Sequence, residues 1–111
     1  MSTKVFRRDL AETDLEEIAD FLTEEGGVEL GLRFLLAAEE AFVRLAGMPS
    51  MGPRWNASAA NLEGIRFWPV PGFQKYLVFY LPIDGGIRVL RVVHGSRNLA
   101  RILAPDVAGR D

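Results

Sequence analysis

Apolar residues recur along the first part of the chain with the period of an α-helix. One set lies at i, i+3, i+4 and i+7, on one face of an amphipathic helix, and consists of Leu15, Ile18, Ala19 and Leu22. The acidic residues around this stripe are expected to form a solvated face with favourable charges near the helix start; they are Asp14, Glu16, Glu17 and Asp20.

A second helical pattern follows Gly26 and Gly27, which are expected to end the first helix. It is predicted to run from about Val28 to Ala46, with a core stripe of Leu35, Ala38, Phe42 and Leu45. Its apolar surface is wider than this stripe because it also contains Leu30, Leu32, Phe34, Leu36 and Val43. One interpretation is a helix packed on two sides, against the first helix and against a sheet. The other is that part of the surface binds a partner protein.

Later in the chain the pattern becomes that of β-strands. Strands are predicted at residues 65–70, 74–81 and 87–94, with a short opening strand at residues 4–8. Pro69 suits an edge strand, and residues 74–81 are apolar on both alternations, as in a strand inside a sheet. Asp84 and Gly85 indicate a hairpin turn. Period-two alternation in the last strand places Arg88, Leu90, Val92 and His94 on one face and Ile87, Val89, Arg91 and Val93 on the other.

This order of elements predicts one α+β domain over residues 1–111. A two-helix hairpin packs on an antiparallel sheet of about four strands, in the order β-α-α-β-β-β, with the opening strand beside the last. Residues from about 104 to 111 are expected to be a flexible tail. The segment from Gly47 to Glu63 is predicted to be a long loop. Its Trp55 is either a plug over the core or an interface anchor, and the sequence favours neither.

Composition argues against several kinds of site. The chain has no cysteine and a single histidine, His94, so disulfides, thiol catalysis and a histidine-rich metal site are excluded, and we expect neither metal nor cofactor. The start of the sequence has no apolar segment typical of a signal peptide, and no apolar run is long enough to cross a membrane. The expected location is therefore the cytoplasm, with no membrane partner.

The charges are distributed unevenly. Residues 1–60 contain six basic and eleven acidic side chains, whereas residues 61–111 contain seven basic and four acidic ones. A dedicated nucleic-acid binder is usually basic throughout, because neutralisation of phosphates supplies most of its affinity. We therefore expect no direct specific DNA binding by this chain alone, although a local basic surface in the second half remains compatible with the sequence.

The ordered set of segments over about Lys4 to Leu103 resembles the RelE/ParE superfamily of bacterial type II toxin–antitoxin toxins. Within this superfamily the chain resembles ParE-type members more closely than RelE-type members. AETDLEEIADFL is similar to the first helix of the family, and RFLLAAEEAFVRLAGMPSMG to its second helix with the following Pro and Gly. LEGIRFWPVPGFQKYLVFY and IRVLRVVHGSRN resemble its three C-terminal strands.

The resemblance implies one of two activities. RelE-type members are small ribonucleases that cut mRNA on the ribosome, and ParE-type members are thought to bind DNA gyrase without catalysis. Leu77 stands near the place where RelE-type enzymes have an arginine, and no aromatic residue follows Tyr80. If the chain were a nuclease, its catalytic residues would be Arg97, His94 and Arg91. Because His94 has no obvious carboxylate partner, we expect it to be structural and to donate to a nearby backbone carbonyl.

The resemblance therefore implies a toxin that inhibits DNA gyrase by direct binding, with no catalytic residues, and that a cognate antitoxin neutralises. An antitoxin segment that is disordered and partly acidic at its C-terminus would lay apolar side chains along the helical hairpin and place its acids against arginines. The residues expected to bind antitoxin or target are Arg66, Arg88, Arg91, Arg97, Leu30, Leu32, Leu36 and Trp55. Two alternatives stay open: a ribosome-dependent mRNA endoribonuclease, and an inactive toxin fold that acts as an interaction module.

Overall fold

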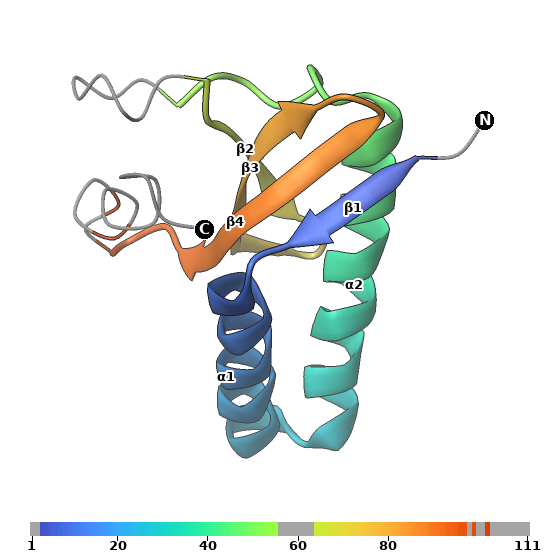
Figure 1. Cartoon of the computed structure of the whole chain (residues 1–111). Helices are drawn as coiled ribbons and strands as arrows, with labels where there is room; N and C mark the ends of the chain where they lie inside the picture. Colours follow the sequence, from blue (N-terminus) through green and yellow to red (C-terminus); the bar gives the residue numbers. More distant parts are fainter. Residues whose placement is uncertain (1–2, 56–63, 98, 100–101, 103–111) are drawn as a thin grey trace.

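The computed structural model describes residues 3–55, 64–97, 99 and 102. The chain forms strand β1 (Lys4–Arg7), helices α1 (Asp9–Gly26) and α2 (Val28–Gly47), and strands β2 (Arg66–Val70), β3 (Phe73–Ile83) and β4 (Gly86–His94). The two helices form a hairpin that packs against the sheet (Figure 1). The predicted fold class and element order are confirmed, whereas the tail predicted from residue 104 lies outside the described residues.

The strand order in the sheet is β1-β4-β3-β2. The pairs β2–β3 and β3–β4 are antiparallel, but β1 pairs with β4 in parallel, so the sheet is mixed and the prediction of a wholly antiparallel sheet is corrected. The reason is that the helical hairpin carries the chain away from the sheet and back again, so that β2 starts in the same direction as β1. Strand β3 then runs opposite to β2, and β4 runs opposite to β3, so β4 has the same direction as β2 and β1. The predictions that the opening strand lies beside the last strand and that Pro69 lies in an edge strand are confirmed.

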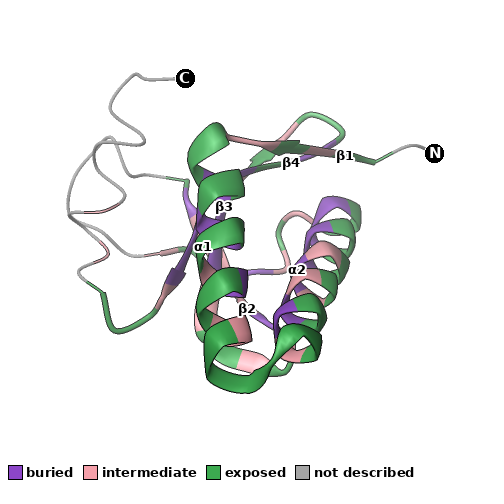
Figure 2. Ribbon diagram, turned by 90° about the horizontal axis from the view of Figure 1, so that it is seen from below, coloured by how far each residue is buried: buried purple, intermediate pink, exposed green. Residues whose placement is uncertain are grey.

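Most of the core lies between the helices and the sheet, where buried residues of both helices face buried residues of the central strands (Figure 2). Phe34 of α2 is at its centre, fully buried and in edge-to-face contact with the rings of Phe73 and Tyr76 at 5.3 and 5.4 Å. The helices approach closely at Gly31, where a Cβ atom would lie 2.8 Å from the carbonyl oxygen of Ala19 and would also overlap the side chain of Thr23. A residue without a side chain is therefore needed at this helix crossing.

A β-bulge interrupts the pairing of β4 with β3. Phe79 pairs with Arg91 and Tyr80 pairs with Val89, so Leu90 is an extra residue in β4. A bulge changes the phase of the side chains that follow it. The helix-side core accordingly contains Ile87, Val89 and Val92, and the cluster on the opposite face contains Leu90 and Val93. The predicted strict alternation is therefore wrong beyond Arg91.

The bulge places Arg91 beside helix α1. Its guanidinium donates two hydrogen bonds to the carboxylate of Asp14, from Nε to Oδ2 at 2.7 Å and from Nη2 to Oδ1 at 2.9 Å. The backbone N–H of Val92 donates to the same Oδ2 at 2.9 Å. The side chain of Asp14 is only 8% exposed and that of Arg91 only 16%. The prediction that Asp14 lies on a solvated face is therefore wrong, and three hydrogen bonds to the carboxylate offset the cost of removing its charge from water.

Replacing Asp14 by Asn should destabilise the fold strongly. The change removes the negative charge beside a largely buried guanidinium, and breaking a buried ion pair from one side typically costs about 3–5 kcal/mol. Because Arg91 keeps some contact with solvent, we expect the free energy of unfolding to fall by about 3 kcal/mol, measured by urea denaturation. Glu17→Gln, at an exposed position of the same helix, is the control and should change it by less than about 0.5 kcal/mol. Equal effects of the two substitutions would contradict the structural role of Asp14.

Candidate functional site

The end of β4 and the face of α1 beside it border a shallow hollow of about 210 Å³. Its lining mixes charged, aromatic and aliphatic side chains and includes Glu17, Phe21, Tyr76, His94 and Arg97. Phe21 is 52% exposed, a large fraction for a phenylalanine. Asp14 also contributes to the lining, so the ion pair with Arg91 forms one margin of the hollow. This combination of apolar and charged groups is typical of a surface that contacts another macromolecule.

His94 lies at the rim of this hollow, and its ring is used within the fold. Its Nδ1 accepts a hydrogen bond from the backbone N–H of Ser96 at 3.1 Å and contacts Ser96 Oγ at 2.7 Å. The ring also packs edge-to-face on Tyr76, with the centroids 5.2 Å apart. Because Nδ1 accepts the bond from the backbone, the neutral ring carries its proton on Nε2. The prediction that His94 donates to a backbone carbonyl is therefore corrected, since the ring accepts from a backbone N–H instead.

The structure brings together only part of the arginine set predicted from the sequence. Arg97 is exposed and lines the hollow with His94, and Arg91 reaches its margin through Asp14. Arg66 and Arg88 lie elsewhere, Arg66 in edge strand β2 and Arg88 opposite Phe6 in the β1–β4 pair. The four arginines therefore do not form one continuous patch.

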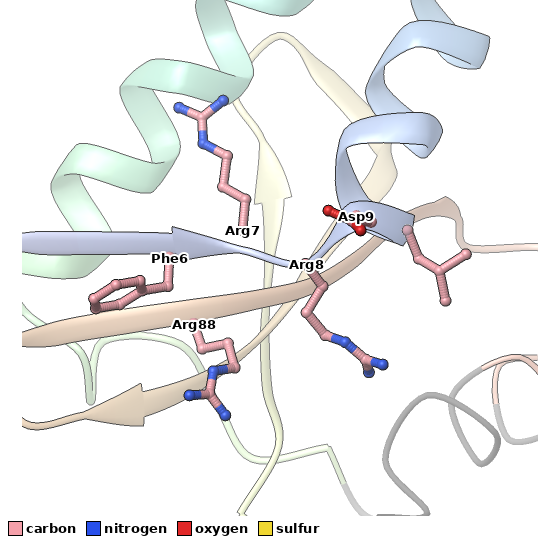
Figure 3. Close-up of a pocket in the computed structure, with 6 residues that line it drawn as sticks. Phe6, Arg7, Arg8, Asp9 and Arg88 are labelled. Atoms are coloured by element: carbon pink, nitrogen blue, oxygen red, sulfur yellow. The ribbon is translucent and has the colours of Figure 1, made fainter. Parts of the chain in front are cut away.

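Arg88 lines a second hollow, of about 350 Å³, at the junction of β1 and α1. Figure 3 shows Arg8 and Arg88 on one side of this junction, while Arg7 points away from them towards α2. The rim also carries two apolar side chains, Phe6 at 51% and Leu10 at 42% exposed. The sequence prediction did not include Phe6, Arg8 or Leu10. The available signal in the sequence was an aromatic residue directly before two consecutive arginines in the short predicted opening strand.

Arg7 has a structural role instead. Its guanidinium pairs with Glu39 of α2, lies 3.7 Å from Glu12 of α1, and sits 5.0 Å from the centroid of the Phe42 ring. The hydrogen bond to Glu39 raises the pKa of Arg7 above its already high ordinary value. The side chain thus joins β1 to both helices and contributes little positive charge to the second hollow.

The leucines predicted to bind a partner differ in exposure. Leu30 is half-buried, whereas Leu32 is 54% and Leu36 is 70% exposed. Val43, which was assigned to the same widened surface, is 63% exposed. Helix α2 does pack against both α1 and the sheet, yet these three apolar side chains are left in solvent. Packing on two sides therefore explains Phe34 and not Leu32, Leu36 or Val43.

Residues 5–99 match the family model described as ParE toxin of type II toxin-antitoxin system, parDE. The chain belongs to the ParE toxin family. Ten chains of solved structures match it as well, among them one described as the chromosomal ParDE TA system from P. aeruginosa. This chain and that one share 17% sequence identity and a TM-score of 0.68, with 83% of this chain and 95% of the other covered. At this identity the likeness shows a shared fold. No curated protein matches the sequence.

In this ParE-family toxin the loop after α2 is fixed by Tyr80 and Arg66. The Tyr80 hydroxyl donates to the carbonyl oxygen of Pro49 at 2.8 Å and accepts from the Gly52 N–H at 3.0 Å. Arg66 Nη1 donates to the carbonyl oxygens of Gly52 and Ser50 at 2.6 and 3.3 Å. Burial raises the pKa of Tyr80, although the Gly52 hydrogen bond and the Arg66 charge act to lower it. The signal for this loop-fixing role in the sequence is a tyrosine within an apolar strand, because a buried hydroxyl needs a hydrogen-bond partner.

Trp55 closes the opposite face of the sheet of this toxin. It is half-buried and packs edge-to-face on the ring of Phe79, with the centroids 5.8 Å apart. Its backbone N–H donates to the carbonyl oxygen of Ile65 at 2.8 Å. Of the two interpretations drawn from the sequence, the structure supports the plug over the core, and contact of Trp55 with a partner stays a prediction.

Two kinds of feature are absent from the described residues. None of the helices there is long and apolar enough to cross a membrane. No group of three or more histidine, aspartate or glutamate side chains in that part of the chain is arranged to hold a metal ion.

Tyr80→Phe should destabilise the toxin by leaving the Gly52 N–H and the Pro49 carbonyl without their partner. Loss of one partner of a buried hydrogen bond costs about 1–3 kcal/mol, so we expect a fall of this size in the free energy of unfolding, measured with urea. Tyr76→Phe is the matched control, because the Tyr76 hydroxyl makes no hydrogen bond with the described residues and its loss should cost much less. If both variants were equally stable, the Tyr80 contacts would not fix the loop.

The same tyrosines should make the toxin less stable at alkaline pH. Burial raises the pKa of both Tyr76 and Tyr80 above the ordinary value of 10.0. The unfolded chain then loses these protons at a lower pH than the folded chain does, so stability is intact below pH 10.0 and falls as the pH rises through the folded-state values. Urea midpoints measured from neutral to strongly alkaline pH should fall less steeply in the Tyr76→Phe/Tyr80→Phe double variant. An identical slope would refute this assignment.

Proposed function

We propose that this toxin inhibits DNA gyrase by direct binding and that a cognate antitoxin neutralises it. The observation that carries the proposal is the match to the ParE toxin family over residues 5–99. ParE-type members of the superfamily are thought to bind DNA gyrase without catalysis. Two physical features of the candidate site also favour binding over catalysis.

The first supporting feature is that few positively charged groups near His94 are available to act on a phosphate. Cleavage of RNA requires positive groups that can stabilise the charge developing on phosphate. Arg91 is engaged by the buried carboxylate of Asp14, so its charge is already neutralised. Leu77 packs with the apolar cluster on the face of the sheet opposite the helices. Arg97 is then the cation that lines the hollow beside His94, which favours a recognition role for this surface.

The second supporting feature is the pair of surfaces available to an antitoxin. The hollow at the β1–α1 junction combines Arg8 and Arg88 with the exposed apolar side chains of Phe6 and Leu10. An acidic segment with apolar anchors fits such a surface, because its carboxylates can pair with guanidinium groups while its apolar side chains cover Phe6 and Leu10. Leu32 and Leu36 of α2 offer further apolar area to the same disordered segment.

The test of the target is a gyrase supercoiling assay with the purified toxin. Inhibition should appear with gyrase and be absent with a topoisomerase I relaxation control. Arg97→Glu should raise the half-inhibitory concentration by about 10- to 100-fold, which corresponds to the loss of a charge-assisted hydrogen bond worth about 1–3 kcal/mol. Arg54→Glu, at an exposed position away from both hollows, should leave inhibition nearly unchanged. Full supercoiling in the presence of excess toxin would refute the gyrase proposal.

A parallel assay with ribosome-bound mRNA separates binding from catalysis. We expect no site-specific cuts, and we expect His94→Ala to act through stability, since its ring supports the turn at Ser96 and packs on Tyr76. General acid and base groups each contribute about 10²- to 10⁴-fold to a catalysed rate. Site-specific cuts that disappear in Arg97→Ala would therefore make the chain an endoribonuclease and overturn the proposal.

A further inference from the structure

The outer face of α2 carries apolar and charged side chains that nothing in the described fold covers. Leu32, Leu36 and Val43 fall on one side of the helix, because residues four and eleven apart return to nearly the same angle around the axis. They are 54%, 70% and 63% exposed. Figure 2 shows exposed residues along the side of α2 that is turned away from α1. This face consists of Leu32, Leu36 and Val43 with the charged residues Glu29, Arg33, Glu40 and Arg44, and is called the α2 outer face below.

A shallow hollow lies at the middle of the α2 outer face. It has a volume of about 480 Å³ and is lined by Arg33, Leu36, Ala37 and Glu40 together with the turn at residues 71–73. The four helical residues have the spacing i, i+3, i+4 and i+7. Four residues at this spacing form the hole that receives one apolar side chain of a facing helix in knobs-into-holes packing. Leu36 is therefore both an exposed apolar side chain and one wall of a hole of the kind that accepts such a side chain.

The charges on this face are complementary to themselves. Four charged residues of this face take part in none of the ion pairs among the described residues; they are Glu29, Arg33, Glu40 and Arg44. If a second copy of α2 lies antiparallel to the first, with the two-fold axis between Leu36 and Ala37, Arg33 of each copy faces Glu40 of the other. The same axis places Glu29 of one copy opposite Arg44 of the other.

The apolar residues fit the same axis. It brings Leu36 of one copy against Leu36 and the hollow of the other, and it brings Leu32 of one copy within about one helical turn of Val43 of the other. A parallel arrangement in register would instead place Arg33 against Arg33 and Glu40 against Glu40. Like charges facing each other across a helix pair disfavour that arrangement.

We propose that the free toxin forms a two-fold symmetric dimer through the α2 outer face, with the α2 helices antiparallel and Leu36 at the axis. Burial of Leu32, Leu36 and Val43 drives the association, and the charge pairs set its register, because ion pairs at a solvent-exposed rim contribute more to specificity than to affinity. The dimer is a property of the toxin alone and does not depend on gyrase being its target. Bound antitoxin that covers Leu32 and Leu36 would displace the second copy.

Sedimentation velocity over a concentration series tests the charge pairs. Arg33→Glu places Glu against Glu40 at two symmetric positions, and Glu40→Arg places Arg against Arg33, so each variant alone should weaken dimerisation by at least about tenfold. An equimolar mixture of the two variants should recover dimers, because each position 33 of one variant then faces an opposite charge at position 40 of the other. Positions 33 and 40 are both exposed, so the two variants should fold normally, which circular dichroism checks.

Chemical cross-linking tests the position of the axis. The chain has no cysteine, so a single introduced cysteine reports only on its own position. Leu36→Cys should cross-link efficiently to its copy with a short bifunctional maleimide, since the two positions lie on either side of the axis. Leu32→Cys is the matched control on the same face. Its two copies are separated by about nine residues along the helix axis, on the order of 13 Å, and should cross-link poorly.

Three results would each overturn the dimer. One is a free toxin that stays monomeric throughout the concentration series. If Leu36→Glu then weakens only antitoxin binding, the α2 outer face belongs to the antitoxin. Another is equal cross-linking of Leu32→Cys and Leu36→Cys, which indicates unspecific association. The third is a mixture of Arg33→Glu and Glu40→Arg that stays monomeric. The gyrase assay with the wild-type toxin is independent of all three, so failure of one proposal is distinguishable from failure of the other.

Discussion

The contact of Asp14 with Arg91 and with the backbone of Val92 determines how the two layers of this toxin fit together. The carboxylate belongs to α1, and its donors belong to β4. They are the guanidinium of Arg91 and the backbone N–H of Val92, two consecutive residues that directly follow the bulge. The guanidinium of Arg91 is largely buried and therefore needs a carboxylate partner. Asp14 can fill this role because the bulge turns both the Arg91 side chain and the Val92 N–H towards helix α1. Helix α2 follows from this placement, because it crosses α1 at Gly31 without a side chain between them.

The bulge also determines what lies beyond it. After the change of phase, Val92 joins the helix-side core and His94 packs on Tyr76, which itself contacts Phe34. The hollow at the end of β4 therefore rests on a chain of packed rings that reaches the centre of the protein. Substitutions at His94 should for this reason be interpreted through stability before any chemical role is assigned to the ring.

Much of the fold could be predicted from sequence because helical and strand periods are strong local signals. The helical hairpin, the turn at Gly85 and the edge position of Pro69 all follow from residues close together in the chain. The parallel pairing of β1, the bulge at Leu90 and the burial of Asp14 depend on partners that are distant in sequence. Asp14 follows Ala11 by three residues and precedes Ile18 by four, so it lies at the border of the apolar stripe. Only the presence of Arg91 across the interface decides that it is buried.

The candidate site was less predictable because several arginines have structural roles within the fold. Arg7, Arg66 and Arg91 are bound by Glu39, by loop carbonyls and by Asp14 respectively, and a sequence shows charge without showing what neutralises it. The surfaces that remain differ in chemistry. The hollow beside Arg8 and Arg88 joins two arginines to exposed apolar side chains, which suits an acidic segment of an antitoxin. The α2 outer face alternates acidic and basic residues around Leu36 and so complements a copy of itself. A disordered, acidic segment can pair its carboxylates with the arginines of the first surface, but on the second it meets Glu29 and Glu40 as well as Arg33 and Arg44. Its contact with the α2 outer face therefore depends on covering Leu32 and Leu36, and there it competes with the second copy of the toxin.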